Sequence, residues 1–153
     1  MVARTYRATI RYSELAEEVQ EKTGVRTRML MHYWIGEVLG RVSHDCRAKG
    51  EPLLSALCVD AGGSVGPCYG ALIAELEGMA PSDADDHAAE ERLYCYRHFG
   101  ATLPPDGGRP ALTPQMLARR RRERRTGGGP RPPRMCPNCH LALPAKGICD
   151  LCS

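Results

Sequence analysis

The chain has 153 residues, of which 5% are aromatic and 25% charged, and its formal net charge is +3. This length suits one modest globular domain with an appendage, and the few aromatic residues require a core built mostly from aliphatic side chains. Residues 1–7 have no apolar run behind them, and no stretch reaches the length of a membrane helix. We therefore expect a protein with no membrane partner, in the reduced environment of the cytoplasm.

Charge is distributed unevenly along the chain. Residues 119–134, the basic belt, carry eight arginines against one glutamate, so this belt has a charge of +7 and the remainder sums to −4. Residues 73–91 contain seven acids and no lysine or arginine. The pattern predicts an acidic-to-neutral body with a positively charged segment near its end.

The first part of the chain predicts a strand followed by two helices. Residues 4–11 alternate loosely, as in a short strand, and Ser13 suits the N-cap of a helix that ends at Gly24. A second helix is expected over residues 27–49, with Trp34 as a core anchor. Its expected apolar stripe comprises Leu30, Trp34, Val38 and Val42, and Met31, Ile35 and Leu39 lie beside this stripe and widen the apolar face.

A β-hairpin is expected next. Residues 53–59 are typical of a strand, residues 60–63 of a turn, and residues 64–69 of the partner strand. Two helices and a hairpin are the order of a winged-helix module, and also of many small α+β domains. The opening Tyr12-Ser13-Glu14-Leu15-Ala16 is similar to that of winged-helix domains, including the alkylguanine-repair family. The repair nucleophile motif Pro-Cys-His-Arg is absent, so repair chemistry is not implied.

If the two helices form a helix-turn-helix, two further arginines are expected to contact nucleic acid. Arg26 and Arg28 would lie at the start of the recognition helix, where base and phosphate contacts are made. The alternative is an ordinary turn between two helices with solvated arginines. Residues 50–66 also resemble a stretch of small bacterial and phage proteins that have no assigned role.

The second half predicts three further helices, over residues 71–77, over residues 87–99, and from Thr113-Pro114 onward. The last helix runs into an arginine cluster. Gly- and Pro-rich residues 127–133 then form a tether. The arginine cluster consists of Arg119, Arg120, Arg121, Arg122, Arg124 and Arg125.

The arginine cluster predicts contact with nucleic acid. Six arginines on about two helical turns surround the helix with positive potential that suits a phosphate backbone. The cluster has no interleaved aromatic residues, so base stacking on it is not expected. The alternatives are contact with an acidic protein surface, the chain's own residues 73–91 included, and a solvated linker that keeps the chain soluble.

The C-terminal residues 135–153 predict a zinc site. Cys136 and Cys139 form one Cys-x-x-Cys pair, Cys149 and Cys152 form another, and nine residues separate the pairs. Two such turns facing each other supply four thiolates at tetrahedral angles for one structural Zn²⁺. The segment resembles the short zinc ribbons found at the ends of many bacterial proteins. That resemblance implies a bound metal and a binding module, without implying a reaction.

Other interpretations of these cysteines stay open. Cys136-x-x-Cys139-His140 also matches the attachment pattern of c-type haem, and the pairs could form disulfides in an oxidising compartment or a redox pair in a thioredoxin-like context. Zinc explains all four residues together. The other cysteines, which are expected to be small buried apolar residues, are Cys46, Cys58, Cys68 and Cys95.

No catalytic constellation is recognisable. His44-Asp45-Cys46 is compact, but consecutive helical residues point in different directions. Asp83, Asp85, Asp86 and His87 suit a solvated helix start better than a divalent-cation or hydrolase site.

The sequence thus predicts an α+β, winged-helix-like body (residues 1–110), an Arg-rich helix with linker (111–134) and a zinc ribbon (135–153). The expected function is non-enzymatic: an accessory or regulatory nucleic-acid-binding protein, with DNA as the expected partner. The alternative is a protein-interaction adaptor whose basic helix and ribbon dock onto a larger enzyme complex.

Overall fold

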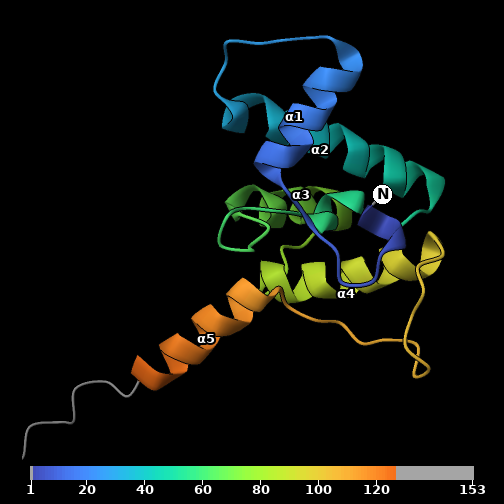
Figure 1. Cartoon of the computed structure of the whole chain (residues 1–153), viewed down its shortest axis with the longest axis vertical. Coiled ribbons are helices and arrows are strands. Elements are labelled where there is room, and N and C mark those ends of the chain that lie inside the picture. Colours follow the sequence, from blue (N-terminus) through green and yellow to red (C-terminus); the bar gives the residue numbers. More distant parts are fainter. Residues whose placement is uncertain (1, 127–153) are drawn as a thin grey trace, which may run out of the picture. The chain divides into compact units, whose positions relative to one another are not determined.

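The computed structural model describes residues 2–126, apart from the side chain of residue 32 (Figure 1). The chain divides into two units, Met1–Leu117 and Ala118–Ser153. Within the described residues, helices and a two-stranded sheet combine, so the α+β prediction is confirmed. In chain order the elements are η1 (Val2–Arg4), β1 (Ile10–Arg11), α1 (Tyr12–Thr23), α2 (Met31–Lys49), η2 (Leu54–Leu57), β2 (Cys58–Val59), α3 (Pro67–Glu77), α4 (Ala84–His98) and α5 (Pro114–Thr126).

The expected hairpin is wrong. Strand β2 pairs in parallel with β1, placing Ile10 opposite Cys58, and residues 64–69 supply no partner strand. The turn at Asp60 does form, since its backbone N–H donates to the Ser64 carbonyl at 2.8 Å. The chain then enters α3 with Pro67 in its first turn. Proline suits a first helical turn and cannot donate to a strand ladder, which explains why a helix replaces the winged-helix strand.

The ends of the first two helices were better predicted than their starts. Gly24 and Gly50 close α1 and α2 in the left-handed conformation, with φ of 70° and 67°. Ser13 is not the N-cap, because α1 already begins at Tyr12 and the Arg11 backbone N–H donates to the Glu14 carboxylate at 2.9 Å. Of the strand expected over residues 4–11, only the last two residues form β1.

Helix α2 buries the edge of the predicted apolar face that holds Ile35, rather than its central stripe. Ile35, Ser43 and Cys46 are each at most 3% exposed, whereas Leu30 is 63% exposed and Trp34 is only partly buried. The buried face packs against η2, which also contacts α4. Because η2 approaches from this side, the tertiary contact decides which side of a broadly apolar helix faces the core.

The main core cluster lies among α2, η2, α3 and α4, and consists of Cys46, Leu53, Ala56, Val59, Val65, Tyr69, Ile73 and Ala88.

Two buried polar side chains hold the loops around this core by hydrogen bonds. Asp85, at the start of α4, accepts hydrogen bonds from the Ser64 hydroxyl and the Val65 backbone N–H, both at 3.0 Å. Arg92 donates to the Ala56 carbonyl at 3.1 Å. Both interactions satisfy groups that would be costly to bury alone.

Candidate nucleic-acid interface

The basic helix α5 begins at a capped position. The Thr113 hydroxyl accepts a hydrogen bond from the Met116 backbone N–H at 3.3 Å, and Pro114 follows it as the first helical residue. The same hydroxyl donates to the Gly63 carbonyl at 2.8 Å, and Met116 is only 1% exposed. The predicted Thr-Pro start is therefore confirmed, and it is fastened to the turn at residues 60–63.

The arginine cluster lies on the continuous helix that follows. Five of its members are exposed and Arg120 is partly exposed. Successive helical residues point about 100° apart, so these side chains surround the axis, as the sequence predicted. The Arg119 guanidinium lies 3.5 Å from the Glu123 carboxylate, and both side chains are exposed. Such a pair stabilises little, and six arginines against one glutamate leave residues 119–126 with a charge of +5.

Arg26 and Arg28 do not lie on a recognition helix, which corrects the helix-turn-helix placement. Both are exposed in the connection before α2, which begins at Met31 rather than at residue 27. The Thr27 hydroxyl accepts a hydrogen bond from the Met29 backbone N–H at 3.1 Å. A threonine hydroxyl that bonds nearby backbone competes with helix formation, which explains the later start. The alternative interpretation, exposed arginines in an interhelical connection, describes these residues.

The predicted zinc ligands Cys136, Cys139, Cys149 and Cys152 lie outside the described residues. Of the other cysteines, Cys46, Cys58 and Cys95 are buried, as predicted, whereas Cys68 is exposed. Burial raises the pKa of Cys58 and of Cys95 to about 12, which keeps these thiols neutral. Residues 2–126 contain no group of three His, Cys, Asp or Glu side chains that could hold a metal ion.

The side chains of residues 83–87 point to separate partners. The Asp83 carboxylate accepts from the backbone N–H groups of residues 85 and 86, both at 3.0 Å, and so caps α4. Asp85 holds the loop at residues 64–65. The His87 ring lies 3.1 Å from the Tyr69 hydroxyl and 3.7 Å from a Glu77 carboxylate oxygen. This arrangement matches the helix-start interpretation.

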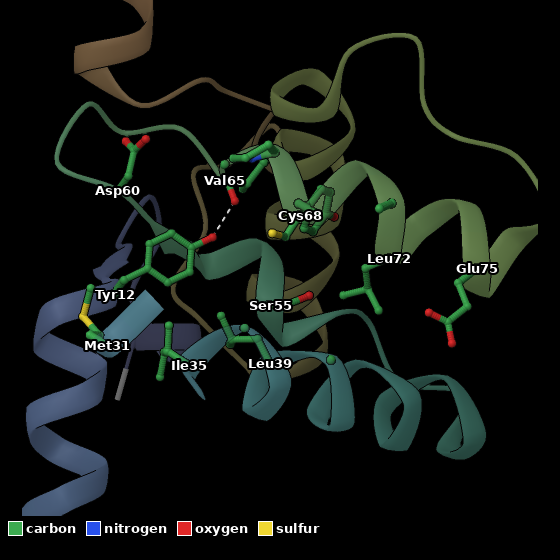
Figure 2. A pocket seen from close by; sticks show the side chains of 16 residues that line it. Tyr12, Met31, Ile35, Leu39, Ser55, Asp60, Val65, Cys68, Leu72 and Glu75 are labelled. Carbon is green, nitrogen blue, oxygen red and sulfur yellow. Dashed lines mark hydrogen bonds between the residues drawn. The ribbon is translucent and has the colours of Figure 1, made fainter. Parts of the chain in front are cut away.

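A groove between α2 and α3 was not predicted as a site (Figure 2). It encloses about 510 Å³, and its apolar walls include Ile35 and Leu39 of α2 and Leu72 of α3. The Tyr12 hydroxyl donates to the Val65 carbonyl at one end. The one signal in the sequence is the pair Gly36 and Gly40, four residues apart, which marks a helix face open to close approach.

Comparisons with protein-family models, with curated proteins and with solved structures found no match. Within residues 2–126, no helix is both long enough and apolar enough to cross a membrane.

Proposed function

We propose that this protein is a non-enzymatic nucleic-acid-binding protein, with an accessory or regulatory role and with DNA as its expected partner. The arginine cluster of α5 is the proposed contact surface. The observation that carries the proposal is the exposure of these arginines on a regular helix in which one glutamate opposes six positive charges. Guanidinium groups form bidentate hydrogen bonds with phosphate oxygens, and they release condensed counterions when they do so.

We expect the proposed binding mode to have little specificity for nucleotide sequence. Phosphate contacts position a protein on a nucleic acid without carrying sequence information, and the cluster has neither aromatic stacking residues nor amide side chains within it. Residues 64–69 form no strand of a wing, so α5 rather than a winged-helix surface bears the proposal. We therefore expect tight binding at low salt with weak sequence preference.

The proposed zinc ribbon supplies the second part of the binding arm. Four cysteines in two Cys-x-x-Cys pairs are the complete donor set of a closed Zn²⁺ site, and thiolates are the ligands that zinc favours in structural sites. Cys136, Cys139, Cys149 and Cys152 would hold the ion, which would fold the ribbon without taking part in a reaction. Metal analysis of the purified protein should find about one zinc per chain. Zinc that survives Cys136→Ser combined with Cys149→Ser would contradict this ligand set.

A gel-shift series at low salt tests the proposed interface. The wild-type protein is compared with a variant in which all six arginines of the cluster become glutamine, and with a matched variant in which they become lysine. Both replacements retain helix propensity, but only lysine retains charge. We expect shifted duplex DNA with the wild-type and lysine proteins and none with the glutamine protein. Parallel lanes with single-stranded DNA and RNA identify the preferred nucleic acid, and no shift in any lane would refute the proposal.

A further inference from the structure

Two glycines of α2 line the groove between α2 and α3. These are Gly36 and Gly40, and a Cβ added at either would meet no atom within 4 Å. Ser55 of η2 and Val65 also line the groove, as Figure 2 shows. Glycine inside a helix costs about 1 kcal/mol relative to alanine, and no contact within the described residues explains either glycine.

The charges that line the groove have one sign. Its lining lies entirely within the described part of the chain, and the only Asp, Glu, Lys, Arg or His side chains in it are Asp60 and Glu75. Figure 2 places Asp60 near one end of the groove and Glu75 near the other. The rest of the lining is mostly apolar. Asp60 already accepts a hydrogen bond from the Ser64 backbone N–H at 3.0 Å, and the Glu75 carboxylate lies 3.1 Å from the His44 ring, but no lysine or arginine lines the groove. An occupant that matches this surface carries apolar side chains and favours positive over negative charge.

Residues 25–33 of the same chain, the α1–α2 segment, have this composition. Four large apolar side chains are well exposed here: Val25 (67%), Met29 (60%), Leu30 (63%) and Tyr33 (65%). Arg26 and Arg28 are exposed between them, and the segment contains no acidic residue. Figure 1 shows the connection between α1 and α2 as a projecting loop. Four exposed large apolar side chains within nine residues exceed the singly scattered apolar residues of an ordinary surface, so we treat this segment as an interaction surface.

We propose that the occupant of the groove is a second copy of this chain. In this dimer, the α1–α2 segment of each copy lies in the α2–α3 groove of the other, with Arg26 and Arg28 facing Asp60 and Glu75. Both complementary surfaces belong to one chain, so a two-fold arrangement uses each of them twice and closes without further copies. Met31, within this segment, already lines the groove, so the two surfaces are continuous on each copy.

Sedimentation velocity of the full-length, nucleic-acid-free protein at low salt tests this dimer. The wild-type protein should show a concentration-dependent monomer–dimer equilibrium. Gly36→Leu combined with Gly40→Leu fills the groove and should weaken association at least about tenfold in Kd. The matched control is Gly70→Leu in α3, because a Cβ there also meets no atom within 4 Å and Gly70 does not line the groove. All three substitutions raise helix propensity, and circular dichroism checks that each variant is folded.

A charge exchange tests the pairing. Arg26→Glu combined with Arg28→Glu should weaken the dimer about tenfold or more, and adding Glu75→Arg should recover part of the loss. Recovery separates pairing from a general effect of net charge. A protein that stays monomeric at every concentration would overturn the proposal. A dimer that withstands the double glycine substitution would overturn it as well, because its interface would then lie elsewhere.

Discussion

Replacing Gly63 with alanine tests how the start of the basic helix is built. Gly63 has φ of 78°, and a Cβ added there would lie 2.2 Å from the Thr113 hydroxyl oxygen. That hydroxyl both caps α5 and donates to the Gly63 carbonyl. The methyl group therefore imposes a left-handed backbone cost and also forces Thr113 away from its two partners.

The expected loss in the free energy of unfolding is the sum of the backbone cost and the cost of the lost hydrogen bonds. A left-handed conformation costs a non-glycine residue about 1–2 kcal/mol. Losing an N-cap and a buried hydrogen bond costs about 2 kcal/mol more. Gly63→Ala should therefore lower the free energy of unfolding by about 3–4 kcal/mol. Gly24→Ala is the matched control, because Gly24 has φ of 70° but no atom within 4 Å of an added Cβ. It should lose only about 1–2 kcal/mol.

Urea titrations followed by the fluorescence of Trp34, the single tryptophan of the chain, measure the free energy of unfolding of both variants. In a Thr113→Ala background, the extra cost of Gly63→Ala should fall toward that of Gly24→Ala, because the crowded hydroxyl is gone. Equal losses for the two glycine variants in the wild-type background would refute the proposed contact between Gly63 and Thr113.

Three further predictions concern buried groups. Asp85→Asn should lower the free energy of unfolding by about 1.5–3 kcal/mol in urea titrations, because a charged acceptor of two hydrogen bonds is lost; an unchanged midpoint would contradict this role. With the ribbon cysteines replaced by serine, a thiol reagent should modify Cys68 promptly and the buried Cys46, Cys58 and Cys95 only on unfolding; fast modification of a second thiol would contradict the burial of these three. Burial raises the pKa of Cys58, Cys95 and Tyr96 to about 12, so these groups ionise first in the unfolded chain. Their contribution to stability is complete below pH 9 and is lost as pH rises toward 12, at about 1.4 kcal/mol per pH unit for each group above its ordinary pKa; urea midpoints that stay constant from pH 8 to about 10.5 would contradict this effect.

Local signals in the sequence predicted the parts of the fold that depend on local chemistry. Gly24 and Gly50 end helices because only glycine adopts a left-handed backbone freely, and Thr113-Pro114 starts one because the hydroxyl and the fixed φ act within one turn. The α1 start and the hairpin were wrong, and α2 buries only one edge of its predicted apolar face. The short parallel pair β1–β2 joins residues about 48 positions apart in the chain, and sequence spacing gives no signal for such a pairing.

For the candidate site, too, the sequence predicted what depends on local composition and missed what depends on tertiary packing. The exposed arginine cluster follows directly from its composition, since so many charges on one helix cannot be buried. The placement of Arg26 and Arg28 depended on where α2 begins, which hydroxyl–backbone hydrogen bonds decide. The α2–α3 groove arises only when α2 and α3, separated by residues 50–66, pack together, so Gly36 and Gly40 indicated a close approach without defining the groove.

The salt dependence of binding to a fluorescent DNA duplex, read by anisotropy, tests the central claim most directly. If about four arginines of the cluster contact phosphates together, log K should fall against log salt with a slope of about −3.6, or about 150-fold between 50 and 200 mM. The all-lysine variant should retain this slope, and the all-glutamine variant should lose both the slope and the affinity. A slope that the glutamine replacement leaves unchanged would contradict the claim that the arginine cluster of α5 binds the phosphate backbone.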